Sequence, residues 1–146
     1  MRTTKSASRM KVFLSYAAKD KDLAQTIGAQ LSEAGFRVRD PDRDRLPAAD
    51  SSAEPESEIR SADAVVVFVS PEAMTSQWVS REIEYSLGAK HLSGRLIPVV
   101  VRPTKEAPWI FSALNPVRHK RVSQTGREII GLLSQPAHVP QVKRLA

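Results

Sequence analysis

The segment Ala64–Val69 (AVVVFV) constrains the fold more than any other, because its six consecutive apolar residues include four valines. A strand with one face in water alternates apolar and polar residues, whereas a strand that is covered on both faces has no such alternation. We therefore expect residues 63–70 to form the central strand of a mainly parallel sheet. Helices should cover both faces of that sheet, which makes the chain an α/β protein.

Further strands of this sheet are predicted on either side of the central segment. Residues 10–17 (MKVFLSYA) and 95–101 (RLIPVVV) are similar apolar runs, and residues 36–40 (FRVRD) alternate as an edge strand does. A weak fifth strand is expected within residues 115–123. Pro98 has no backbone N–H, so we expect it at the start of its strand or at a bulge.

Helices are expected between these strands. Asp20 can cap a helix that ends before Gly35 and whose apolar residues recur at i, i+4 and i+8 (Leu23, Ile27, Leu31). Residues 54–62 indicate a short helix, and Ser76 can cap a longer one.

The last helix is predicted from Thr125 and Glu128, which have the spacing of a capping box. Residues 41–53 and 71–75 are predicted to be loops. The alternation of strands and helices supports the α/β assignment.

With 146 residues, the chain has the length of one domain. We expect this domain to span residues 10–135, with a flexible N-terminal extension at 1–9 and a C-terminal tail or linker at 136–146. The longest apolar runs fall far short of the ~20 residues that a membrane helix needs, so no membrane partner is expected.

The net charge is +6, which favours anionic partners. The basic residues are scattered, however, and nucleic-acid binding is therefore a minority interpretation. The sequence has no cysteine, which excludes disulfides and thiolate chemistry and fits a reducing compartment such as the cytoplasm.

Several common catalytic patterns are missing from the sequence. The glycines form neither GxGxxG nor GxxxxGK[ST], and no serine lies in GxSxG. The three histidines are far apart in the sequence and lack carboxylates at metal-ligand spacing, so no metal site is predicted. The central strand is followed by Ser70 and Pro71 rather than by the aspartate of a phosphoacceptor domain.

The segment SQWVSREIEYSL (residues 76–87) distinguishes two glutamates. On a helical wheel, Glu82 lies beside the apolar stripe and one turn beyond Trp78, whereas Glu84 points toward solvent. This helix follows the central strand, so it should begin near the carboxyl edge of the sheet, where open α/β folds bind ligands. The hydrophobic pattern alone favours a structural interpretation, in which Glu82 forms an ion pair at the border of the helix and Trp78 belongs to the core. The alternative is that Glu82 is a functional carboxylate.

The sequence resembles the Toll/interleukin-1 receptor (TIR) domain family, in particular its bacterial members. The resemblance runs from about Lys11 to Leu133 and is carried by VFLSYAAKD, GFRVRD, VVVFVSPEAMTSQWVSREI and IPVVV. The third of these is the most specific. Ser76, Trp78 and Glu82 are similar to the S-x-W-x-x-x-E motif that holds the catalytic glutamate of the family's enzymes.

The resemblance implies a flavodoxin-like fold with five parallel strands in the order 2-1-3-4-5 and helices on both faces. It also implies cleavage of the nicotinamide–ribose bond of NAD⁺, giving nicotinamide plus ADP-ribose or a cyclic isomer, in antiphage defence. NAD⁺ would be a substrate, and no cofactor or metal is implied. The alternative within the family is a non-enzymatic module that assembles with other TIR domains. Both activities imply self-association as a homo-oligomer or filament.

The implied catalytic residue is Glu82. The resemblance further implies substrate contacts by Ser76, Trp78 and three residues that follow the first strand (Ser15, Tyr16, Lys19). Trp78 would either line the pocket or pack beside it. The sequence departs from the family where Ala17 and Ala18 replace a basic residue, and where segment 40–56, at the position of the family's BB loop, lacks a glycine.

Overall fold

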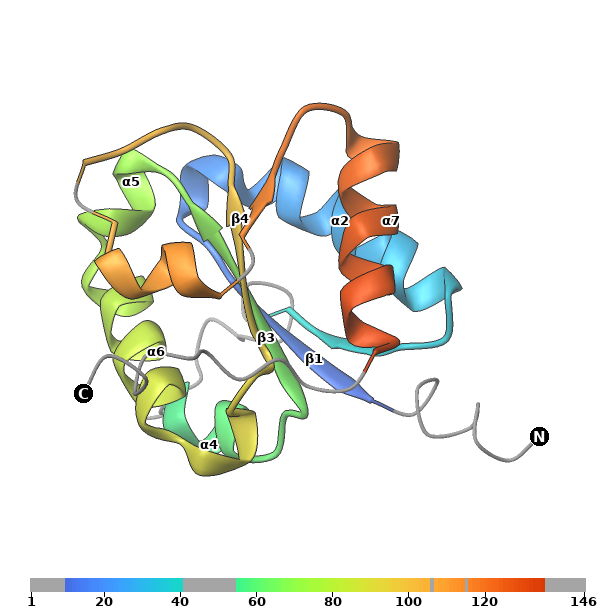
Figure 1. The fold of residues 1–146 in the computed structure, drawn as a ribbon, viewed down its shortest axis with the longest axis horizontal. Coiled ribbons are helices and arrows are strands. Elements are labelled where there is room, and N and C mark those ends of the chain that lie inside the picture. Colours follow the sequence, from blue (N-terminus) through green and yellow to red (C-terminus); the bar gives the residue numbers. More distant parts are fainter. Residues whose placement is uncertain (1–9, 41–54, 106, 115, 136–146) are drawn as a thin grey trace, which may run out of the picture.

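The computed structural model describes residues 10–40, 55–105, 107–114 and 116–135 (Figure 1). The expected extension at 1–9, loop at 41–53 and tail at 136–146 lie outside these residues. The described strands form one parallel sheet in the order β2-β1-β3-β4-β5. They are β1 (Lys11–Ser15), β2 (Arg37–Arg39), β3 (Ala64–Val69), β4 (Leu96–Val100) and β5 (Val117–Arg118). The order and direction of the strands are those expected of a flavodoxin-like fold.

The apolar segment Ala64–Val69 is the central strand β3, as predicted. It pairs with β1 on one side and with β4 on the other, and each of its six residues is buried. The alternating segment forms β2 at the edge of the sheet, where β1 is its one partner among the described strands. The hydrophobic pattern therefore predicts correctly both the centre and one edge of the sheet.

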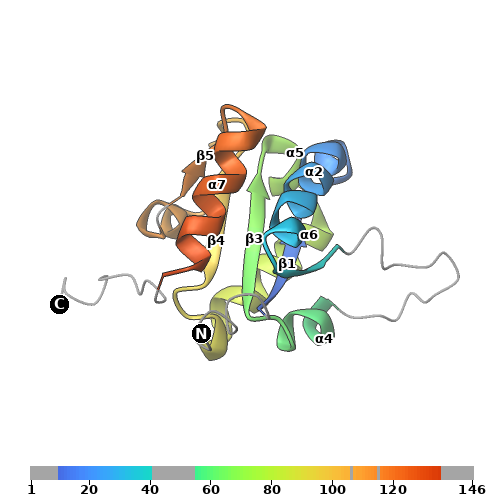
Figure 2. The same ribbon diagram turned by 90° about the vertical axis from the view of Figure 1, so that its right-hand side faces the viewer.

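Helices cover both faces of this sheet (Figures 1 and 2). On one face lie α2 (Lys21–Glu33) and α7 (Val122–Leu133), which contact each other. On the other face lie α4 (Pro55–Arg60), α5 (Pro71–Met74) and α6 (Gln77–Gly88). Three short 3₁₀ helices complete the described elements: η1 (Ala18–Asp20), η2 (Lys90–Leu92) and η3 (Trp109–Ala113). None of the described helices has the length and hydropathy to cross a bilayer.

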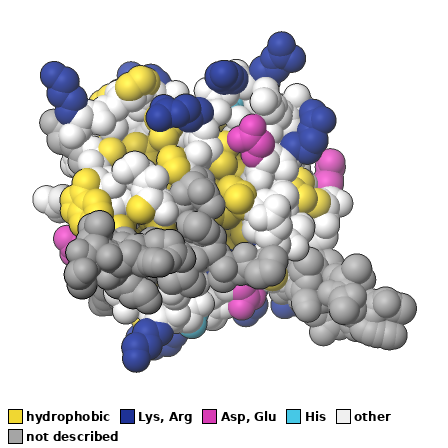
Figure 3. Space-filling view, in the orientation of Figure 1, with side chains coloured by type: hydrophobic (Ala, Val, Ile, Leu, Met, Phe, Trp, Pro, Cys, Tyr) yellow, Lys and Arg dark blue, Asp and Glu magenta, His cyan; other side chains and the backbone are white. Residues whose placement is uncertain are grey.

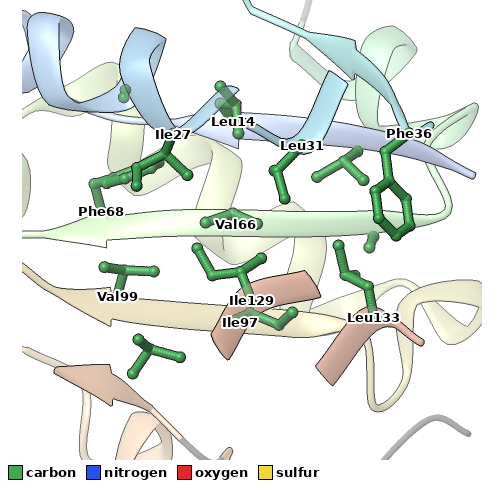
Figure 4. Close-up of a cluster of buried hydrophobic side chains, with 14 of the residues drawn as sticks. Leu14, Ile27, Leu31, Phe36, Val66, Phe68, Ile97, Val99, Ile129 and Leu133 are labelled. Atoms are coloured by element: carbon green, nitrogen blue, oxygen red, sulfur yellow. The ribbon is translucent and has the colours of Figure 1, made fainter. Parts of the chain in front are cut away.

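Alternate residues of β3 contribute to two separate hydrophobic cores, because successive side chains of a strand point to opposite faces. Val66 and Phe68 pack with residues of β1, α2 and α7, as Figure 4 shows. Val65 and Val67 pack instead with Ile59 of α4 and with the apolar side of α6. Burying both faces in this way positions α6 against the sheet.

Helix α2 ends at Glu33, just before Gly35, as predicted. The φ of Gly35, 103°, lies in the left-handed region, which a residue without a Cβ adopts without strain. The N–H of Gly35 donates to the carbonyl of Ser32, and the N–H of Phe36 donates to that of Leu31. These two bonds form a Schellman motif that satisfies the last carbonyls of α2.

Two predictions near the sheet are wrong. Residues 71–75 are not simply a loop, because Pro71–Met74 form α5, with the Ser70 hydroxyl accepting from the N–H of Ala73. Serine followed by proline is a favoured start of a helix. Pro98 lies in the middle of β4 rather than at its start or at a bulge. It is tolerated there because β5 pairs only with Val99 and Val100 among the described residues.

Two predicted helix caps are also wrong. The side chain of Asp20 makes no capping bond to α2, because it bonds to residues across the sheet edge. Helix α7 begins at Val122, three residues before the predicted capping box, so Thr125 lies inside the helix. The hydroxyl of Thr125 instead hydrogen-bonds to Nδ1 of His119, at 2.8 Å.

Candidate functional site

The candidate site lies at the carboxyl edge of the sheet, where β1, β3 and β4 end. Ser15 is the last residue of β1, Ser70 directly follows β3, and Arg102 lies two residues beyond β4. Because β3 pairs with both neighbours, their parallel alignment brings these three positions to one edge. Open α/β sheets bind ligands at this edge, at the point where the strand order reverses.

Glu82 reaches this edge from α6. Its side chain is fully buried, and the Ser15 hydroxyl donates a hydrogen bond of 2.6 Å to its Oε1. Helix α6 starts where predicted: the Ser76 hydroxyl caps it by accepting from the N–H of Val79, at 3.1 Å. From this start, Val79, Glu82 and Ile83 all face the sheet and are buried, while Glu84 is exposed. The sequence correctly separates the two glutamates, but Glu82 is buried more deeply than a border position suggests.

A second polar cluster lies at the same edge, around Asp20. This carboxylate is almost fully buried; its Oδ2 accepts from the Ser70 hydroxyl at 2.6 Å, and its Oδ1 accepts from Nη2 of Arg102 at 3.1 Å. The same Nη2 donates to Oε1 of Glu72 at 2.5 Å. Asp20 therefore joins the segments that follow β1, β3 and β4, which explains why its side chain is not available to cap α2.

The guanidinium of Arg102 controls the electrostatics of this cluster. Its hydrogen bond lowers the pKa of the Glu72 carboxyl below the ordinary 4.5, since an opposite charge favours the ionised form. The hydrogen bond that Arg102 donates to Glu72 in turn raises the pKa of the Arg102 guanidinium. Lys19, which the family resemblance assigns to substrate binding, lies at the exposed rim, with its Nζ 3.7 Å from Oε2 of Glu72.

The other residues expected in the site are divided among different contacts. The Tyr16 hydroxyl donates to Oδ1 of the buried Asp40. The other oxygen of this carboxylate, Oδ2, accepts from Nε2 of Gln25 at 3.2 Å. The ring of Tyr16 packs edge-on against Phe68, with 6.4 Å between the ring centroids. Trp78 is half-buried in the first turn of α6. The structure thus brings Ser15 directly to Glu82, while the hydroxyls of Tyr16 and Ser76 bond elsewhere.

Sequence reasoning missed the roles of Ser70, Glu72 and Arg102 and misassigned Asp20 as a helix cap. No local pattern marks the cluster, because the Ser70–Asp20 bond joins residues 50 positions apart and the Arg102–Asp20 bond joins residues 82 positions apart. A usable signal was the Ser-Pro-Glu sequence at 70–72, which is typical of a helix start and places an acidic residue in its first turn.

Another feature of the described residues is a surface pocket of about 540 Å³ away from this edge. It lies at the C-terminal end of α6, and its wall includes Leu87, Leu92, Leu96 and Ile110. Neither Glu82 nor Asp20 contributes to it. Within the described part of the chain, no three His, Asp or Glu side chains are grouped to hold a metal ion.

Comparison with known proteins assigns the family. The sequence profile of the TIR domain matches residues 12–130. The chain belongs to the TIR domain family. A search of curated proteins gives no significant match. The family assignment agrees with the strand order.

Three solved structures resemble this TIR domain. The TIR domain of the Toll-related receptor TRR-2 from Hydra magnipapillata has a TM-score of 0.64 and 18% identity, over 82% of this chain and 90% of that one. A prokaryotic SEFIR domain has a TM-score of 0.68 and 16% identity, covering 87% and 94% of the two chains. A metazoan TIR-STING receptor from C. gigas has a TM-score of 0.67 and 25% identity; the match covers 86% of this chain but only 40% of the receptor.

Proposed function

We propose that this TIR domain is an NAD⁺ glycohydrolase with Glu82 as its catalytic residue. The observation that carries the proposal is a buried carboxylate, hydrogen-bonded to Ser15 at the carboxyl edge of the sheet. A charged side chain is rarely buried without a partner or a function. Its setting in S-x-W-x-x-x-E adds to the support. A role in bacterial antiphage defence belongs to the same proposal.

One carboxylate suffices for this chemistry. The nicotinamide of NAD⁺ begins as a cationic pyridinium and leaves as a neutral molecule, so the leaving group needs no proton. As the bond breaks, positive charge develops on the ribose, and a preorganised anion stabilises that oxocarbenium-like state. Water, or a nucleophile within the same molecule, then attacks the ribosyl carbon. Lys19 at the rim would meet the diphosphate.

The burial of Glu82 has a consequence for activation. Its side chain is 0% exposed in the single chain, so the ribose reaches it only after the covering residues move. We expect self-association to supply the free energy for this movement, in the way that any ligand shifts an equilibrium toward the state it binds. Specific activity should therefore rise with protein concentration.

The test is release of nicotinamide from NAD⁺ over a range of protein concentrations. Glu82→Ala should lower the rate on the order of 10²–10³-fold, the usual cost of removing a preorganised electrostatic group. Glu84→Ala is the matched control, because Glu84 lies on the same helix but faces solvent. Equal loss of activity in the two variants would refute the role of Glu82.

A non-enzymatic assembly module is the second candidate, and exposed apolar surface favours it. Trp109 is 73% exposed, and Leu87, which lines the pocket at the end of α6, is 44% exposed. Figure 3 shows hydrophobic side chains across the centre of the viewed face, with Lys and Arg mainly around its edge. This candidate predicts that the protein associates in a concentration-dependent way and that Trp109→Ser weakens the association. It also predicts that the wild-type protein releases no nicotinamide from NAD⁺.

A further inference from the structure

The Ser15 hydroxyl is committed to a protein contact. Ser15 is fully buried, and the 2.6 Å between its Oγ and Oε1 of Glu82 is typical of a short hydrogen bond to a charged acceptor. A serine hydroxyl has a single proton to donate, and here that proton points to the carboxylate. The family resemblance implies a substrate contact for Ser15, and the structure adds this contact to Glu82.

The hydrogen bond joins α6 to the interior of the parallel sheet. Ser15 ends β1, which pairs with β2 on one side and with β3 on the other, and Ser15 itself is in register with Val67 of the central strand. Glu82 has three side-chain torsions of its own and would otherwise sample several rotamers. A donor fixed to the sheet restricts the carboxylate to one direction.

We propose that Ser15 is a positioning residue for the Glu82 carboxylate, an inference that rests on the proposed glycohydrolase function. Ser15 transfers no proton and does not touch the ribose. Its hydroxyl holds one carboxylate oxygen, so that the anion is oriented before the substrate enters and does not reorganise as positive charge develops. The ionised carboxylate is the form that stabilises a cationic transition state.

A purely structural role is the competing explanation, since a buried carboxylate needs a donor even in an inactive protein. The two explanations differ in kinetics. Loss of a positioning residue lowers kcat while the affinity for substrate is largely retained, because the residue acts through Glu82. Loss of a structural contact lowers the folded fraction but leaves kcat per folded molecule unchanged.

The experiment compares Ser15→Ala with Ser86→Ala at equal folded concentration. Ser86 is a matched control: it is also buried and also bonds to Glu82, but its hydroxyl donates to the backbone carbonyl, at 2.7 Å. Ser15→Ala should lower kcat roughly 10- to 100-fold with KM changed less than about threefold, as expected when a reacting group is misplaced by about 1 Å. Ser86→Ala should keep kcat near that of the wild-type protein. Ser15→Thr, which keeps the hydroxyl, should recover most of the activity.

Unchanged kcat in folded Ser15→Ala would overturn the inference and leave the proposed function intact. A wild-type protein that releases no nicotinamide at any concentration would instead refute the proposed function, and the inference with it. Urea unfolding of Ser15→Ala, Glu82→Gln and the double variant gives a readout without substrate. The double variant should lose less than the sum of the two single losses, whereas additive losses would show that the two side chains do not interact.

Discussion

The structure offers a direct comparison between two arginine–carboxylate pairs that differ mainly in how deeply the carboxylate is buried. Arg102 binds Asp20 at 3.1 Å, with side-chain exposures of 42% and 2%. Arg39 binds Glu58 at 3.0 Å, with side-chain exposures of 44% and 36%. The two guanidinium groups are equally accessible and equally close to their partners, so the pairs differ mainly in the burial of the carboxylate.

This difference sets the expected magnitudes. Exposed ion pairs contribute about 0.2–1 kcal/mol, whereas removing one partner of a fully buried pair costs about 3–5 kcal/mol. Because water still reaches Arg102, the free energy should be smaller than that of a fully buried pair. We expect a coupling free energy of about 2 kcal/mol between Arg102 and Asp20. The coupling between Arg39 and Glu58 should be about 0.5 kcal/mol.

Two double-mutant cycles measure these couplings by urea unfolding at pH 7. One combines Arg102→Ala with Asp20→Asn, and the other combines Arg39→Ala with Glu58→Gln. The cycle is needed because Arg102→Ala also removes the hydrogen bond to Glu72. This bond is lost whether or not Asp20 is replaced, so its free energy cancels from the coupling. A coupling for Arg102 and Asp20 no larger than that for Arg39 and Glu58 would refute the claim that Asp20 ties the strand ends together.

Three further perturbations follow from the same structure. Gly35→Ala should destabilise the fold by about 1–2 kcal/mol in urea unfolding, because Gly35 has a φ of 103°; Gly131→Ala, where an added Cβ meets nothing, should not. Phe68→Ala should cost about 3–5 kcal/mol by the same assay, since the ring is fully buried. Because folding lowers the pKa of Glu72, its contribution to stability is present above the ordinary pKa of 4.5 and is lost as the pH falls through the lowered value. Glu72→Gln should therefore destabilise the protein at pH 7 and lose this effect in acid; an undiminished effect at pH 3 would contradict the assignment.

The fold could be predicted from the sequence wherever the signal was hydrophobic periodicity. The uninterrupted run of β3 and the alternation of β2 fix the centre and one edge of the sheet, because burial of apolar surface dominates their placement. The two wrong helix caps arise where a polar side chain had more than one possible partner. Asp20 and Thr125 are good capping residues by type, but Asp20 bonds to Ser70 across the sheet edge and Thr125 bonds to His119 in the segment before α7.

The candidate site was predictable only in part for the same reason. Helical periodicity places Glu82 toward the sheet and Glu84 toward solvent, so the choice between them is a local property. The Ser15 contact spans 67 residues and depends on the alignment of β1 with α6. Such a contact follows from topology, which the family resemblance supplied and which patterning alone did not.

The most direct test of the account is the rate of nicotinamide release in a single turnover, with the assembled protein in excess over NAD⁺. Glu82→Gln keeps the size of the side chain and removes its charge, so we expect it to bind NAD⁺ but to cleave it on the order of 10²–10³-fold more slowly than wild type. Cleavage by Glu82→Gln at the wild-type rate would contradict the central claim that this buried carboxylate stabilises the transition state.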